Sequence, residues 1–259
     1  MIPVVGGSNP LGHPTTPQAR FAEVLQESAH GIEVNARGAL ASEDPEYLHQ
    51  LRVSSRRLRS ALRAFRPILP HKDAERLRRS LRKLSPALGH ARDWDVLVGR
   101  LGAGGNASEH QAARREARHA LRSGAFHKLL ERVRALQAED SAESLAQFGA
   151  AALSRMHRKL IKAARDIDWS EPAQRHAVRI RVKRLRYGCE FFAPAFAARR
   201  TAPYIGALKE LQRILGELND IAVARRLVAA QADERALLRS LEAAWKRFAR
   251  RAPFWRARG

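Results

Sequence analysis

The sequence contains a single cysteine, Cys189, among 259 residues. One cysteine cannot form an intramolecular disulfide or a multi-cysteine zinc site, and such scarcity is typical of a reducing compartment. No apolar run approaches the roughly 18 residues of a membrane span, and residues 1–18 lack the basic and apolar segments of a signal peptide. We therefore expect a cytoplasmic protein without membrane contact, in which residues 1–18 form a flexible leader.

Acidic residues are also few. The 26 Asp and Glu residues stand against 48 Lys and Arg residues, which gives a formal net charge of +22 and a pI near 11.5. Arginine supplies 40 of these cations. This preference for arginine reflects either a genome biased toward arginine codons or a need for planar groups that chelate phosphate oxygens. The excess predicts a polyanionic partner. Hydrophobic residues make up 45 % of the chain, enough for a proper core.

Runs of β-branched residues are almost absent, and hydrophobic residues after residue 18 recur at helical period, so we expect an all-α protein. Seven breaks predict about eight helices. They lie at residues 39–45, 67–70, 102–108, 138–144, 169–172, 194–203 and 231–234. Ser42 is predicted to cap the helix after the first break. Residues 102–108, the most glycine-rich stretch, are predicted to form an exposed loop.

The sequence that begins at His49 resembles the sequence that begins at His176, 127 residues later. HQLRVSSRRLRSALRAF corresponds to HAVRIRVKRLRYGCEFF, and residues 49–96 share 13 identities in 48 positions with residues 176–223. Random pairing in this composition would give roughly four. We infer an internal duplication. It predicts one domain, residues 19–259, made of two pseudo-symmetric four-helix bundles, residues 19–140 and 141–259.

In each copy, cations occupy one face of a helix, which we call the stripe, and apolar residues occupy the other face. Within an arc of about 80°, the first copy places His49, Arg52, Arg56, Arg59 and Arg63. The second copy places on the equivalent face His176, Arg179, Lys183 and Arg186. Neighbouring like charges on a helix repel one another. A face that repels itself and occurs twice favours an anionic ligand over the alternative of a merely solvated face, which would accept acidic residues equally well.

His49 and His176 begin the two cationic faces. They could be structural histidines or zinc ligands, but no carboxylate or cysteine accompanies them at ligand spacing. We interpret them as donors to phosphate oxygens, because an adjacent polyanion would raise the histidine pKa. Affinity is then expected to strengthen below about pH 7.

The next helix of each copy ends in LGHARD or LGELND. Glycine inside a helix costs about 1 kcal/mol relative to alanine, so Gly89 and Gly216 are predicted to allow helices to approach closely. Asp93 and Asp220 are predicted to orient arginines by ion pairing, with local capping as the alternative.

These motifs together resemble the CHAD domain, the conserved histidine α-helical domain. The resemblance rests on the two stripe sequences, on the LG-x-x-[RN]-D endings and on WKRFARRAPFW at residues 245–255, and it covers residues 20–255. It implies two four-helix bundles with a basic cleft or pore between them. It also implies binding of inorganic polyphosphate and association with polyphosphate granules or, for some members, polyhydroxyalkanoate granules.

The resemblance also implies a set of ligand-facing residues. By position, these are His49, Arg52, Arg56, Arg82, His176, Arg179, Lys183 and Lys209, with Arg57, Arg59, Arg184 and Arg186 as additions. Glu190 and Glu210 stand where the first copy has Arg63 and Lys83, so the second half of the cleft is expected to be less basic.

The expected function is therefore polyphosphate binding without catalysis, metal or cofactor, at polyphosphate granules and with granule proteins as further partners. Nucleic-acid binding is one alternative, although the stripes lack interleaved aromatic residues for base stacking and aromatics are 6 % of the chain. A scaffold on polyhydroxyalkanoate granules is another. An enzyme is disfavoured, because cleavage of phosphoanhydrides usually needs metals held by clustered carboxylates. The acidic residues here are scattered, and we take Asp93 and Asp95 as the nearest to a cluster.

Overall fold

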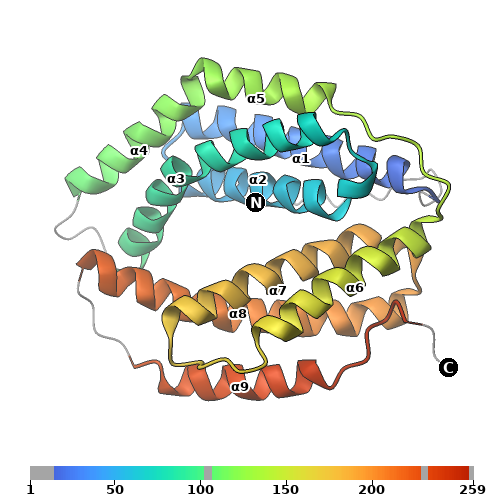
Figure 1. The fold of residues 1–259 in the computed structure, drawn as a ribbon. Helices are drawn as coiled ribbons and strands as arrows, with labels where there is room; N and C mark the ends of the chain where they lie inside the picture. The colour runs from blue at the N-terminus through green and yellow to red at the C-terminus, as the bar shows by residue number, and fades with distance from the viewer. Residues whose placement is uncertain (1–14, 102–106, 229–232, 257–259) are drawn as a thin grey trace.

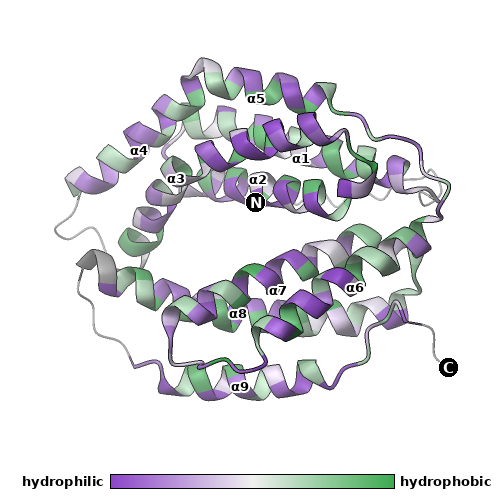
Figure 2. Cartoon of the chain, viewed as in Figure 1, coloured by the Kyte–Doolittle hydropathy of each residue, from purple (hydrophilic) through white to green (hydrophobic). Residues whose placement is uncertain are grey.

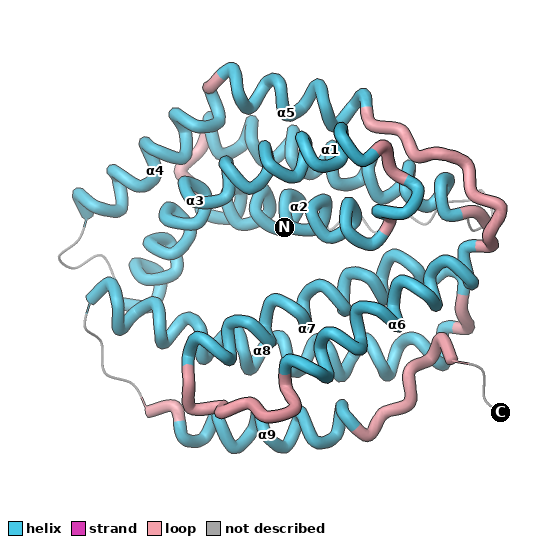
Figure 3. Tube along the Cα trace, in the orientation of Figure 1, coloured by secondary structure: helices cyan, strands magenta, loops and turns pink. Residues whose placement is uncertain are grey.

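The computed structural model describes residues 15–101, 107–228 and 233–256, and throughout these ranges all regular structure is helical (Figures 1 and 3). The all-α prediction is confirmed for them. The α-helices are α1 (Pro17–Ala41), α2 (Pro45–Ala64), α3 (His71–Leu101), α4 (Ala107–Arg122), α5 (Gly124–Ala135), α6 (Leu145–Ala163), α7 (Pro172–Phe192), α8 (Ala198–Val228) and α9 (Arg235–Ala249). Short 3-10 helices follow α2 and α7: η1 (Arg66–Ile68) and η2 (Ala193–Ala195).

Two helix boundaries differ from the sequence-based expectation. The described part has nine α-helices because Ser123 separates α4 from α5, with its hydroxyl accepting a hydrogen bond from the backbone N of Phe126 at 3.3 Å. Ser42 ends α1 instead of capping α2, a role taken by the Asp44 carboxylate, which accepts from the backbone N of Glu46 at 2.8 Å. Most of the leader predicted at 1–18, and residues 102–106 of the predicted loop, lie outside the described residues.

The helices pack as two groups. Helices α1 to α5 lie together in the upper part of Figure 1, and α6 to α9 lie together in the lower part. The stripe helices α2 and α7 pack against each other across the boundary, as do α1 and α6. The first group therefore holds five described helices, where a bundle of four was expected. Along the helices, hydrophilic and hydrophobic residues alternate as in amphipathic helices that bury one face (Figure 2).

Aromatic residues join the two groups where α2 and α7 end. Phe65 and Phe192, which correspond in the duplication, contact each other with ring centroids 5.0 Å apart. The buried Nε of Arg20 on α1 donates to the carbonyl of Phe191 at 2.8 Å. Cys189 is buried on α7, and its burial raises the pKa of the thiol well above the usual value. Because the contact between Phe65 and Phe192 lies where the two helices end, the earlier turns of α2 and α7 are left for the cations.

None of the helices in the described ranges has both the length and the apolar character needed to cross a bilayer.

Candidate functional site

A cavity of about 710 Å³ lies between the two groups of helices. It is lined by the first turns of α2 and α7 and by the later turns of α3 and α8, the helices that carry the duplicated motifs. We call it the first cavity. Six predicted site residues line it: His49, Arg52, Arg56, His176, Arg179 and Lys183. The duplication thus brings three equivalent pairs to one space.

Arg52 lies against α3 on one side of this cavity. A Cβ atom added to Gly89 would stand 2.9 Å from the Nη1 atom of Arg52, so glycine at this position leaves room for the guanidinium group. Burial lowers the pKa of Arg52 to about 10, and the neighbouring Asp93 opposes that shift. Asp93 therefore supports the charged form of Arg52, in keeping with the orienting role predicted for it.

Gly216, the counterpart of Gly89, has different surroundings. A Cβ atom there would meet no described atom beyond its own helix within 4 Å, and Gly216 lines the first cavity. The prediction that this glycine permits close helix approach is wrong. At Gly89 the close approach is made by the Arg52 side chain and not by a neighbouring helix backbone.

The second copy contributes two strongly desolvated cations. Burial, and then the charges of Arg56 and Arg179, lower the pKa of Lys183 to about 6. The Lys183 amine is therefore mostly neutral at pH 7 in the free protein. Burial also lowers the pKa of Arg179, against the effect of Asp220. The buried Nε atom of Arg179 has no hydrogen-bond partner among the described residues, so it is a donor that an anion could satisfy.

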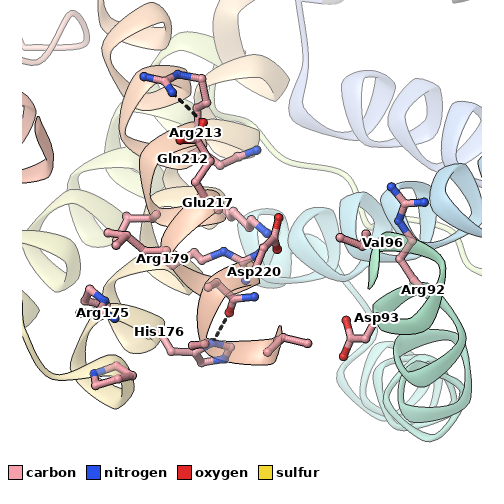
Figure 4. Close-up of a pocket in the computed structure, with 18 of the residues that line it drawn as sticks. Arg92, Asp93, Val96, Arg175, His176, Arg179, Gln212, Arg213, Glu217 and Asp220 are labelled. Carbon is pink, nitrogen blue, oxygen red and sulfur yellow. Dashed lines mark hydrogen bonds and ion pairs between the residues drawn. The ribbon is translucent and has the colours of Figure 1, made fainter. Parts of the chain in front are cut away.

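The two histidines occupy equivalent places but make different contacts. Burial, and then the charge of Arg92, lowers the pKa of His49, so its imidazole is neutral at pH 7. His176 has its Nδ1 atom 3.3 Å from the Oδ1 atom of Asn219, while Arg92 and Asp93 lie across the cavity (Figure 4). An anion between these walls would raise the pKa of His49 and favour its charged form.

Acidic residues partly balance the cations of the cavity. Glu217 pairs with Arg213 at 2.7 Å. Asp93 and Asp220 also line the cavity, beside arginines of the stripes. Another lining residue, Arg175, is engaged elsewhere, because it pairs with Glu234 at 2.7 Å and donates to the carbonyls of residues 169 and 170. Even without Lys183, the four remaining lining arginines outnumber the two aspartates, so the cavity favours an anion. These arginines are Arg52, Arg56, Arg92 and Arg179.

Three predicted site residues are engaged outside the first cavity. Arg57 pairs with Glu27 at 2.8 Å and stacks over the ring of Phe191, 5.3 Å from its centroid. Two further arginines make equivalent bonds to the next helix of their own copy. These are Arg59 to the Oγ atom of Ser85 at 3.0 Å, and Arg186 to the Oε1 atom of Gln212 at 2.7 Å. Both bonds hold a stripe helix to its neighbour.

The last three predicted residues lie elsewhere. Arg82 and Lys209 are exposed and line no described cavity. Arg184 lines a second cavity of about 620 Å³, formed by α2, η1, α3, α6 and α7. For all twelve residues, direct ligand contact stays a prediction.

Sequence comparison missed several cations. Arg92 lines the first cavity, but its counterpart is Asn219, so the repeat gave no signal for it. The second cavity also contains Arg155 and Lys159 of α6, a helix outside the aligned segments. Arg92 occupies the [RN] position of the LG-x-x-[RN]-D motif, directly before Asp93, so a separate examination of that position in each copy would have found it.

The described residues contain no group of three or more His, Cys, Asp or Glu side chains placed to hold a metal ion.

The comparisons with known proteins agree on one family. The sequence profile of the CHAD domain matches residues 23–229. An uncharacterized protein of Mycobacterium tuberculosis is 28 % identical over 265 residues, which cover 88 % of this chain and 49 % of that protein. The chain thus spans about half the length of the curated relatives that it matches.

Two solved structures share the fold. The crystal structure of the CHAD domain from the plant Ricinus communis is 30 % identical, with a TM-score of 0.70, and covers 96 % of this chain and 92 % of its own. PptA from Streptomyces chartreusis has a TM-score of 0.62 at 18 % identity, covering 91 % of this chain and 98 % of its own. The second likeness shows the fold alone.

Proposed function

The chain belongs to the CHAD domain family, and on that premise we propose that it binds inorganic polyphosphate in the first cavity without cleaving it. The observation that carries the proposal is the meeting of three equivalent pairs of His, Arg and Lys residues in one cavity between the duplicated halves. The association of this family with polyphosphate, and the two-bundle arrangement inferred from the duplication, support it.

The chemistry of the first cavity suits a phosphate polymer. Guanidinium groups grip two oxygens at once, and they do so on any phosphate along a chain. Each cation that neutralises a phosphate releases a counterion, so affinity should fall linearly with the logarithm of the salt concentration. The buried Nε of Arg179 and the neutral amine of Lys183 both gain a favourable partner when an anion enters.

Nucleic-acid binding is the weaker alternative. Single-stranded nucleic acids are held by aromatic side chains on which bases stack. No Phe, Tyr or Trp is among the described residues that line the first cavity. A cavity that holds phosphates but offers no stacking surface favours a polymer without bases.

We also propose that polyphosphate binding directs the protein to polyphosphate granules. A binder that does not consume its polymer would stay attached to the granule that stores it. A scaffold role at polyhydroxyalkanoate granules is the alternative, and it predicts localisation that survives removal of cellular polyphosphate.

The decisive experiment is a titration with long-chain polyphosphate. We expect Arg52→Gln/Arg179→Gln to lose at least tenfold in affinity, since two desolvated contacts to phosphate disappear. The matched control, Arg79→Gln/Arg199→Gln, removes the same charge from exposed positions on α3 and α8 that line no described cavity. We expect it to lose less than about twofold through diffuse attraction alone.

Three outcomes would contradict the proposal. Equal losses in the two double variants would mean that overall charge and not the cavity binds the polymer. Displacement of polyphosphate by short RNA or DNA at equal phosphate concentration would favour nucleic acid. Release of orthophosphate in the presence of magnesium or manganese, abolished by Asp93→Ala, would make the protein an enzyme.

A further inference from the structure

The second cavity is lined by cations from five elements of the fold. They are Arg63, Arg66, Arg78, Arg155, Lys159 and Arg184, and no Asp or Glu is among the described residues that line it. In this respect it differs from the first cavity, whose cations are partly balanced by Asp93 and Asp220. A hollow of this size in which every charged lining residue is positive is a place for an anion.

These cations act on one another. Burial, and then the charges of Arg63, Arg181, Arg59 and Arg78, lower the pKa of Arg184 to about 10. Burial, and then Arg78, also lowers the pKa of Arg63, while Glu75 opposes the shift. Glu75 pairs with Arg78 but does not line the cavity. The protein therefore holds like charges together at the expense of its own stability.

The corresponding positions of the second copy carry larger and less basic side chains. Ser60 and Ala64, small residues that line the second cavity, correspond to Tyr187 and Phe191, whose rings stack with centroids 6.3 Å apart. Arg63 corresponds to Glu190.

Glu190 neutralises its surroundings. It pairs with Arg186 and lies 3.9 Å from Arg57. The two copies therefore differ at these positions. The α7 helix carries two aromatic rings and a carboxylate where α2 carries two small residues and an arginine.

The cationic face of α2 connects the two cavities. Arg56 lines the first cavity, Arg63 lines the second, and Arg59 lies one turn from each on the same face. Both neighbours lower the pKa of Arg59, although burial has the largest effect, so the three charges interact. Arg56 and Arg63 are about 10 Å apart along the axis at 1.5 Å per residue, a distance that a short run of linked phosphates can span.

We propose that the second cavity binds phosphate groups of the same polyphosphate chain that occupies the first cavity, and that the polymer runs between the two along Arg56, Arg59 and Arg63. This inference rests on the proposed function. It makes the polymer's path asymmetric in a protein built from two similar copies, because the second cavity contains Arg63 of the first copy, whose counterpart in the second copy is Glu190.

Arg63→Glu tests the proposal by giving the first copy the residue of the second. The new carboxylate can pair with Arg59 and Arg184, as Glu190 pairs with Arg186 and approaches Arg57. We expect saturation with fewer phosphates per protein and a roughly tenfold loss of affinity for long-chain polyphosphate. Circular dichroism and the melting temperature check that the variant folds.

A second variant tests the opposite wall without introducing an acid. Arg155→Ala/Lys159→Ala removes two exposed cations of the second cavity, whereas Arg158→Ala/Lys162→Ala removes the same two residue types from the same helix outside it. We expect only the first pair to lower the slope of log affinity against log salt, by roughly 1.4 for two lost contacts.

The outcomes separate the two levels of the proposal. If wild type binds polyphosphate and the two α6 pairs behave alike, or Arg63→Glu binds as wild type does, the second cavity is not part of the path. If Arg63→Glu loses a tripolyphosphate site but keeps full affinity for the long polymer, the cavity serves a separate small phosphate ligand and the shared path is wrong. If wild type binds no polyphosphate, the proposed function itself fails.

Discussion

The stripe on α2 and the stripe on α7 descend from one sequence, yet they hold their charges differently. At the head of each helix, three equivalent residues line the first cavity: His49, Arg52 and Arg56 on α2, and His176, Arg179 and Lys183 on α7. Near their C-terminal ends the two helices differ in charge. The α7 helix carries Glu190, which pairs with Arg186, where α2 carries Arg63, which lines the second cavity.

This difference separates two sources of the +22 charge. Three pairs of positions that carry His, Arg or Lys in both copies meet in one cavity, and this meeting supports the proposed shared ligand. Positions that differ between the copies show where a single copy gained a contact or lost one. The expectation of a less basic second half of the cleft rested on Glu190 and Glu210, which do not line the first cavity, whereas Lys183, with its lowered pKa, does.

The strongest contrast between the stripes is Lys183 against its counterpart Arg56. With a pKa of about 6, free Lys183 is about half protonated at pH 6 but only about one per cent at pH 8. Polyphosphate favours the charged amine, so affinity should rise by up to about fiftyfold from pH 8 to pH 6. Lys183→Arg should bind more tightly than wild type at pH 8, and its pH profile should be flatter.

Calorimetry in buffers of different ionisation enthalpy gives the proton uptake directly. Arg56→Lys is the reciprocal control, because it places a titratable amine in the first copy. Parallel pH profiles for wild type and Lys183→Arg would show that Lys183 does not titrate on binding.

Lys183 should also lower the stability of the folded protein. Its folded pKa lies below the unfolded value of about 10.4, so the unfolded chain binds more protons between about pH 6 and pH 10, and wild-type stability rises with pH in this window. Lys183→Met should therefore raise the melting temperature by roughly 2–4 °C per kcal/mol relieved. The gain should be largest near pH 6 and vanish near pH 10. Arg56→Met, at the equivalent position of α2, is the matched variant for comparison.

The histidines offer a smaller contrast. His49→Gln/His176→Gln should weaken polyphosphate binding about fivefold at pH 6, roughly 1 kcal/mol, and less than twofold at pH 8, because burial lowers the pKa of His49 and bound polyphosphate can charge its imidazole only at the lower pH. The exposed His119→Gln is the control. Equal affinity of wild type at pH 6 and pH 8 would remove both the lysine and the histidine from the binding reaction.

The glycine pair should show the smallest effect. Gly89→Ala should displace Arg52 and weaken binding about threefold, because its Cβ would meet the guanidinium at 2.9 Å. Gly216→Ala should leave affinity within about 1.5-fold, since a methyl group there meets open space. Both changes favour the helix by about 1 kcal/mol, so the melting temperature separates the local effect from the general one.

Much of the fold followed from the sequence, because prolines and glycines mark most helix ends. The division between α4 and α5 did not, since Ser123 is followed by a single glycine and helical periodicity continues on both sides. The cap of α2 was missed for a related reason. Ser42 and Asp44 are both good capping residues two positions apart, and the path of the backbone decides between them.

Helical periodicity predicted only those site residues that share one face of a helix. Helical spacing placed His49, Arg52 and Arg56 on one face, and the structure brings them to one cavity with their counterparts. Spacing could not reveal that Arg57 is engaged by Glu27, because that contact joins residues 30 positions apart. Nor could the repeat point to Arg155, whose helix has no aligned partner.

The buried Cys189 can serve as a natural probe of how often the packing around α7 opens. It is the only thiol in the sequence, it is fully enclosed on α7, and its raised pKa keeps it protonated. A thiol reagent can reach it only while the packing around α7 opens, so the rate of modification counts those openings. An anion that spans both groups of helices should slow this reaction, and no label needs to be added to see it.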